Sequence, residues 1–100
     1  MEGKNFLYYR LYSLYGKLLT QKQRETLEDY FGLDLSLGEI AEMRGVSRQA
    51  IKYTLDCTEQ ALLEYEKKLR LLDKIIKIQE LEISENKPLK EEILRILEDG

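Results

Sequence analysis

The chain contains no histidine and a single cysteine, Cys57, among its 100 residues. These two scarcities exclude a Ser-His-Asp triad, a zinc site built from cysteine and histidine, and an intramolecular disulfide. No apolar run approaches the roughly 18 residues that a membrane span requires. We therefore expect a cytoplasmic protein without metal or other cofactor. Because no phosphate-binding glycine loop and no nucleophile beside a base is present, we expect no catalytic residues and no enzymatic activity.

Proline and glycine are also scarce, with one and six residues, and only one valine is present. Leucine and isoleucine recur at every third or fourth position, a spacing typical of amphipathic helices, and no alternating strand pattern occurs. The sequence predicts an all-α fold. An N-terminal helix is expected over 4–18, with its leucines on one face. Its tyrosines, Tyr8, Tyr9, Tyr12 and Tyr15, are expected at the edge of the core, and the alternative is that they stack on bases or bind a partner. Thr20 and Ser36 each stand three residues before a Gln or Glu, which predicts a capping box at the start of two further helices. Gly32 is expected to end the first of these in a left-handed conformation.

The segment from Leu37 to Asp56 has the layout of a helix-turn-helix. Ala41 is small where two helices would cross, Gly45 supplies positive φ in the turn, and Ser47 caps the second helix. We expect Val46 to fill the core between the two helices. The remaining inward positions are Ile40, Ile51 and Leu55.

The outward residues around the second helix are candidates for contact with duplex DNA. Arginine pairs bidentately with guanine and glutamine with adenine, and the residues near the start of a recognition helix reach base edges. The segment 36–56 carries three basic and three acidic side chains, so we expect weak to moderate, salt-sensitive binding. The alternative is an ordinary solvated helix face. The predicted nucleic-acid-binding residues are Arg44, Ser47, Arg48, Gln49, Lys52 and Tyr53, with Arg44 and Ser47 on phosphate.

No proline or glycine interrupts residues 48–83, which predicts one long fourth helix. Leucine or isoleucine recurs there every seven residues, as in a coiled coil, and favours a homodimer. The alternative is that the chain covers both apolar stripes itself. We divide the chain into a helix-turn-helix domain, 1–83, and a short C-terminal helical extension, 84–100. The predicted dimerisation residues are Leu62, Tyr65, Leu69, Leu72 and Ile76.

The run from Tyr15 to Leu69 resembles the YlxM-like helix-turn-helix proteins of Gram-positive bacteria and mycoplasmas. The most specific pieces are LLTQKQRETLEDYF, LSLGEIAEMRGVSRQAI and LLEYEKKL. The same core is similar to region four of bacterial sigma factors, which binds promoter DNA and protein partners. The chain departs from the family pattern at 53–57, where family members carry more polar and basic residues, and the resemblance is poor after Leu81.

The resemblance implies a small regulator linked to the signal recognition particle pathway, because genes of this family neighbour that of the particle's GTPase. It places the nucleic-acid face on Arg48, Gln49 and Lys52. Three functions stay open at this point. They are a dimeric DNA-binding regulator, an accessory factor that binds the particle's RNA or GTPase, and a pure protein-interaction module.

Overall fold

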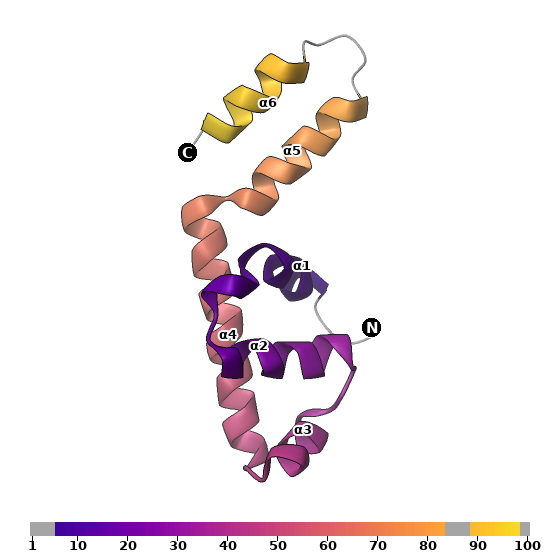
Figure 1. Cartoon of the computed structure of the whole chain (residues 1–100), viewed down its shortest axis with the longest axis vertical. Coiled ribbons are helices and arrows are strands. Elements are labelled where there is room, and N and C mark those ends of the chain that lie inside the picture. Colours follow the sequence, from indigo (N-terminus) through magenta and orange to yellow (C-terminus); the bar gives the residue numbers. More distant parts are fainter. Residues whose placement is uncertain (1–5, 84–88, 99–100) are drawn as a thin grey trace. The chain divides into compact units, whose positions relative to one another are not determined.

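The computed structural model of the chain describes residues 6–83 and 89–98, and every regular element within these ranges is helical. The all-α prediction is therefore confirmed. Contacts divide the chain into two compact units, Met1–Glu64 and Tyr65–Gly100. The helices, in chain order, are α1 (Phe6–Tyr15), α2 (Gln21–Leu27), α3 (Leu37–Arg44), α4 (Arg48–Leu69), α5 (Leu71–Ile83) and α6 (Leu89–Glu98) (Figure 1).

The predicted capping boxes form at both α2 and α3. The Thr20 hydroxyl accepts a hydrogen bond from the Gln23 N–H at 3.1 Å, and the Gln23 side chain accepts one from the Thr20 N–H at 3.0 Å. Ser36 and Glu39 repeat this exchange at 3.0 and 2.9 Å. Both helices therefore begin where their sequences satisfy the otherwise unpaired amides of a first turn.

The end of α2 differs from the sequence prediction at Gly32. The helix passes into a wider π-helical turn, Glu28–Gly32, which closes with a 3.0 Å hydrogen bond from the Leu33 N–H to the Glu28 carbonyl. Positive φ is found two residues beyond the glycine, at Asp34, where it is 55°. The prediction of a left-handed Gly32 is wrong, because the wide turn continues through this residue.

A close helix crossing holds α3 against the start of α4. Ile40, Ala41 and Ile51 form one buried cluster, and Gly45 ends α3 with φ 66° and ψ 34°, as the turn requires. Val46 is the exception to the predicted motif. Its side chain is 46% exposed, so it does not fill the core, although its N–H donates to the Ala41 carbonyl at 3.1 Å. The backbone of Val46 closes the turn, while the side chain faces outward.

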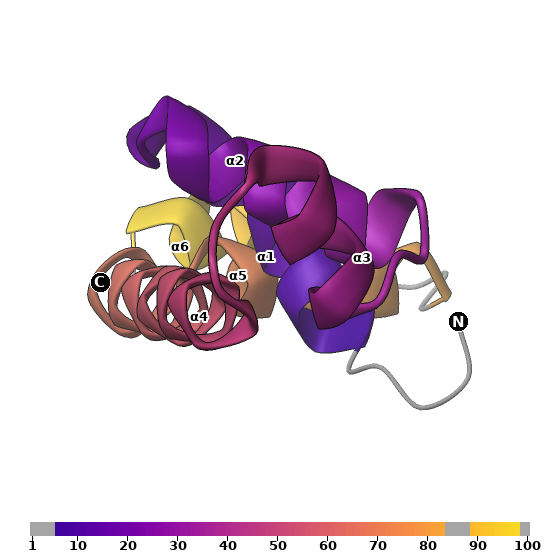
Figure 2. The same ribbon diagram turned by 90° about the horizontal axis from the view of Figure 1, so that it is seen from below.

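The first unit builds its core where α1, α2 and α3 gather on one side of α4 (Figures 1 and 2). Tyr8, Tyr9 and Tyr12 are half-buried at the edge of this core, as predicted. Tyr15 is fully buried, as is Leu62, so the prediction of an edge position is wrong for Tyr15. Three buried threonines each donate their hydroxyl to the carbonyl four residues earlier, and among the described side chains no buried polar atom lacks a hydrogen-bond partner. These threonines are Thr26, Thr54 and Thr58.

The predicted uninterrupted helix over 48–83 is wrong. α4 ends at Leu69, Arg70 adopts φ 55°, and α5 starts at Leu71. The carboxylate of Glu66 accepts hydrogen bonds from the N–H groups of Leu72 at 3.0 Å and Asp73 at 3.1 Å. An arginine in the left-handed region costs about 1 kcal/mol, and the cap from Glu66 offsets that cost. The Glu66 side chain, six residues before Leu72, therefore caps the start of α5 across the break, without proline or glycine.

The break also divides the predicted dimerisation stripe. Leu62 is fully buried in the first unit, which contradicts its predicted place on a dimer surface. Leu72 is buried, and Tyr65 is half-buried. Leu69 and Ile76 are exposed, but Arg70 separates them and the seven-residue repeat does not continue along one helix.

The second unit contains the α5–α6 hairpin (Figure 1). Residues 84–88, which connect the two helices and include the predicted start of the extension at 84, lie outside the described residues. None of the described helices combines the length and the apolar character needed to cross a membrane. The proposed division into 1–83 and 84–100 stays a prediction.

We expect Gly45→Ala to lower the free energy of unfolding by about 1 kcal/mol, because the alanine Cβ is strained at φ 66°. The matched control is Gly38→Ala inside α3, where the nearest atom to a new Cβ is the Ser36 hydroxyl oxygen at 3.9 Å. That variant should be roughly 0.5 kcal/mol more stable than the parent. Urea unfolding measures both, and equal effects of the two substitutions would contradict the assigned turn geometry.

Candidate nucleic-acid interface

The N-terminus of α4 presents polar side chains on a rigid support. The Ser47 hydroxyl accepts a hydrogen bond from the Ala50 N–H at 3.0 Å, which fixes the first turn. Ser47, Arg48 and Gln49 are all exposed, and Ile51 directly behind them is buried. The structure thus brings these three predicted residues together at one helix end, where backbone N–H groups also favour anions.

Lys52 lies one turn further along α4 and is also exposed. Its ammonium donates to both carboxylate oxygens of Asp56, at 2.7 and 2.9 Å. This hydrogen bond raises the pKa of Lys52 above its ordinary value. Because the pair is solvent-exposed, a phosphate could compete with Asp56 for the lysine.

Tyr53 is 71% exposed, the largest exposed fraction among the large hydrophobic side chains described. A hydrogen bond with the half-buried Cys57 raises the pKa of Tyr53 above its ordinary value. A neutral aromatic ring here can pack on a sugar, on a thymine methyl or on a protein partner.

Arg44 does not join this surface, contrary to the prediction of a phosphate contact. Its guanidinium donates to the Thr26 hydroxyl and to the Asp29 carboxylate, both at 2.6 Å. The charged pair is mostly shielded from solvent and ties α3 to α2 and the π-helical turn. The prediction was wrong because the sequence does not show that Asp29, fifteen residues earlier, lies beside Arg44.

The electrostatics of the motif now follow from these pairings. Of its three basic side chains, Arg44 and Lys52 have carboxylate partners, and Arg48 has no ion pair within the described part of the chain.

Sequence reasoning missed the outward position of two apolar residues at the same turn, Met43 at 64% exposure and Val46. Helical spacing alone does not reveal this for Met43, because a residue three positions after the inward Ile40 is expected on the same face of α3.

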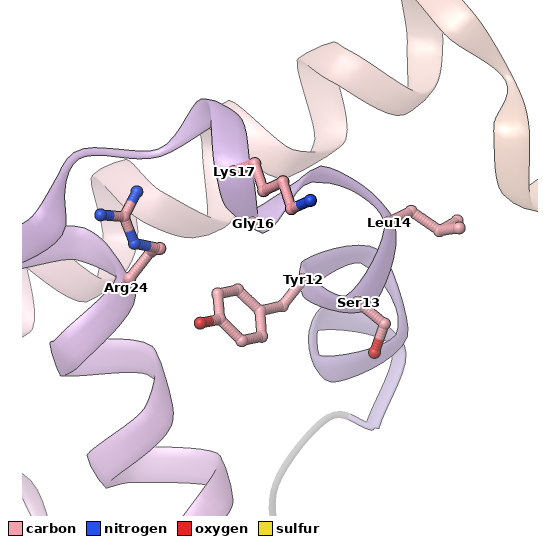
Figure 3. A pocket seen from close by; sticks show the side chains of 6 residues that line it. All are labelled: Tyr12, Ser13, Leu14, Gly16, Lys17 and Arg24. Carbon is pink, nitrogen blue, oxygen red and sulfur yellow. The ribbon is translucent and has the colours of Figure 1, made fainter.

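A hollow of about 430 Å³ lies between α1 and α2 and is a second candidate site. Figure 3 shows its lining residues Tyr12, Ser13, Leu14, Gly16, Lys17 and Arg24. The Tyr12 hydroxyl donates to the Glu28 carboxylate, and Arg24 donates to the Leu19 carbonyl at 2.6 Å. A Cβ on Gly16 would lie 2.7 Å from the Tyr12 ring. The polar groups of Tyr12 and Arg24 are engaged in hydrogen bonds within the protein, so the hollow is a weaker candidate for a binding site than the N-terminus of α4.

Across residues 6–83 and 89–98 no cluster of metal-ligating side chains is found.

The capped α3, the left-handed Gly45 and the exposed start of α4 together define a helix-turn-helix protein. A family described as "Putative helix-turn-helix protein, YlxM / p13 like" matches residues 3–99. The chain belongs to this YlxM/p13-like family. The match extends almost to the C-terminus, so the sequence-based view that the resemblance is poor after Leu81 is wrong.

Relatives with the printed name "UPF0122 protein" agree with this assignment. A protein from Desulforamulus reducens is 55% identical over 60 residues, which cover 60% of this chain and 51% of the relative. The aligned segment therefore spans about half the length of that relative. Proteins from Bacillus cereus and Bacillus thuringiensis subsp. konkukian are 45% identical over 95 residues, covering 88% of this chain and 86% of each relative.

We expect Arg44→Met to lower the free energy of unfolding by about 1–2 kcal/mol, because Asp29 and Thr26 lose a charged donor in a shielded site. A double-mutant cycle with Asp29→Asn should show a clear coupling energy. The matched control is the exposed pair in Lys52→Met and Asp56→Asn, for which we expect a much smaller coupling. Equal coupling energies in the two cycles would contradict the claim that the Arg44–Asp29 pair stabilises the fold.

Tyr12 predicts a stability change at alkaline pH. Burial, followed by the hydrogen bond to Glu28, raises the pKa of Tyr12 from 10.0 to about 12. The folded state then holds this proton more tightly than the unfolded state, so the contribution is fully present below pH 10.0 and is lost as pH rises towards 12. Urea unfolding at about pH 9 and about pH 11 should show a larger loss for the parent than for Tyr12→Phe. Equal losses of unfolding free energy in the parent and in Tyr12→Phe would contradict a raised pKa at Tyr12.

Proposed function

We propose that the protein is a non-enzymatic regulator that binds duplex DNA through its helix-turn-helix. Arg48 and Gln49 contact base edges in the major groove, while Ser47 and Lys52 contact phosphates. Tyr53 packs beside them against the groove wall. Arg44 is left out of this contact set, because Asp29 and Thr26 hold it within the protein.

One observation carries this proposal. Arg48 and Gln49 are exposed on the first turn of α4, and that turn is held by the Ser47 cap and by the buried contact of Ile51 with Ile40. A helix N-terminus fixed this firmly can present a guanidinium and an amide in one orientation, which bidentate pairing with bases requires.

The charge distribution favours weak to moderate affinity for each copy of the motif. Arg48 is available without breaking an ion pair, whereas Lys52 must exchange Asp56 for a phosphate. Phosphate neutralisation supplies most non-specific affinity, so few available cations mean weak binding. A homodimer doubles the contacts and reads two half-sites separated by about one helical turn of DNA or a multiple of it.

A second candidate function is supported by the apolar residues around the motif. Met43, Val46 and Tyr53 are all exposed, and such side chains are enriched at protein interfaces. This favours an accessory role in which the helix-turn-helix contacts a protein. By the family resemblance, that protein would be a component of the signal recognition particle pathway, and the particle's RNA is the third possible partner. We propose this pathway as the cellular setting for either function.

We expect Arg48→Ala to weaken binding to the selected duplex by ~1–3 kcal/mol and to relax specificity at one base pair. The slope of log affinity against log salt should change little if Arg48 contacts a base, and by about one if it contacts phosphate. Selection from fragmented genomic DNA supplies the duplex, and fluorescence anisotropy at several salt concentrations measures the binding.

The matched control is Lys67→Ala, which removes an exposed cation about 28 Å further along α4. This variant should bind like the parent. Equal weakening in both variants would indicate non-specific charge attraction, and no selected duplex at low salt would overturn DNA binding. Crosslinked recovery from cells of particle RNA or of its GTPase, unaffected by Arg48→Ala, would support the accessory role instead.

A further inference from the structure

A strongly acidic stretch lies between Arg24 and Arg44. Residues 25–43 carry six acidic side chains and no basic one, whereas the rest of the chain carries 16 basic and 13 acidic side chains. Negative charge is therefore concentrated on the segment that forms the end of α2, the π-helical turn and α3. The residues proposed above for DNA contact all lie outside this segment.

One part of the acidic segment is also hollowed and apolar. A hollow of about 300 Å³ is lined by Leu35, Glu39, Glu42 and Met43, and we call it the α3 hollow. Met43 is 64% exposed and Leu35 is half-buried, while both glutamates are exposed. α3 lies at the end of the first unit where α4 begins (Figure 1). The hollow thus combines apolar contact area with two carboxylates.

The negative charge of the α3 hollow is not neutralised by the nearest cation along the chain. That cation is Arg44, whose guanidinium is bound to Asp29 and Thr26, both at 2.6 Å. Glu42 forms no ion pair within the described part of the chain. Glu39 accepts a hydrogen bond from the Ser36 N–H at 2.9 Å, but this donor is a neutral amide and leaves the charge of the carboxylate in place.

This combination of side chains selects a ligand that is both cationic and apolar. The carboxylates repel the phosphates of nucleic acid and attract lysine or arginine, while Leu35 and Met43 gain from contact with apolar side chains. The flexible methionine adapts to different apolar surfaces, and the stems of lysine and arginine add apolar contact of their own. A basic amphipathic helix of a protein carries both features on one face.

We propose that the α3 hollow binds a cationic, apolar segment of another protein. Lysine or arginine side chains of that segment pair with Glu39 and Glu42, and its apolar side chains pack on Leu35 and Met43. This inference deepens the accessory role described above and rests on it, because it names the chemistry of the protein that is contacted. It does not depend on DNA binding.

The chain itself contains one basic and apolar stretch, residues 67–77, with five basic side chains and one acidic side chain. Arg70 and Lys77 there pair with Asp73, at 2.9 and 3.2 Å, so part of this positive charge is already neutralised. A separate protein is therefore the better-matched occupant, and the experiment must detect binding of the chain to itself.

The probe is a fluorescein-labelled peptide of about 14 residues, four helical turns, built from leucine and lysine at helical spacing. Fluorescence anisotropy should show that Glu39→Gln/Glu42→Gln binds this peptide about tenfold more weakly than the parent. Glutamine can keep the capping box with Ser36, so the variant loses charge without losing the start of α3. The matched control is Glu64→Gln/Glu80→Gln, which removes two exposed carboxylates outside the hollow and should bind like the parent.

NMR of the full-length protein locates the bound peptide. The methyl signal of Met43 should shift when the lysine peptide is added to the parent, and a peptide with glutamate in place of lysine should not bind. Equal weakening in the two glutamine variants would indicate general charge attraction and would overturn the proposal. An unshifted Met43 signal, or equal binding of the glutamate peptide, would overturn it as well.

Two further measurements separate this proposal from its alternatives. Sedimentation equilibrium tests self-binding, and self-association that Glu39→Gln/Glu42→Gln abolishes would assign the hollow to residues 67–77 and overturn the assignment to another protein. Arg48→Ala should bind the peptide like the parent, so DNA binding and peptide binding can fail separately. Failure to recover a particle component from cells would contradict the accessory role in that pathway, whereas peptide binding is measured on the purified protein.

Discussion

The contact of Ile40 and Ala41 with Ile51 determines how the rest of the first unit is arranged. Only a small residue lets two helix backbones approach this closely, and Ala41 provides that space beside two buried isoleucines. The turn between the helices must then be short and sharp, which Gly45 allows with its left-handed conformation. The orientation of Arg48 and Gln49 follows from this packing, because both precede Ile51 by less than one helical turn.

Two of the three basic side chains of the motif form ion pairs within the protein. Arg44 holds α3 to the turn after α2 through Asp29, and Lys52 holds Asp56 on the surface of α4. These pairs give a nearly neutral surface in which Arg48 is prominent because it has no such partner among the described side chains.

Local sequence signals predicted the elements that depend on neighbouring residues. The capping boxes at Thr20 and Ser36, the Ser47 cap and the left-handed Gly45 follow from side-chain chemistry within a few positions. Longer-range features could not be predicted in the same way. The Arg44–Asp29 pair depends on tertiary packing, and the end of α4 depends on Glu66, whose carboxylate reaches past Arg70 to the next helix. The outward Val46 likewise reflects the path of the turn and not the polarity of the residue.

The joint at Arg70 also governs how motion can spread along the chain. In a continuous helix, each amide hydrogen bond supports the next, so fraying at one end can progress turn by turn. Here the regular sequence of bonds is interrupted at Arg70, and the start of α5 is held by the carboxylate of Glu66. Opening of α5 can therefore proceed as a cooperative event separate from α4.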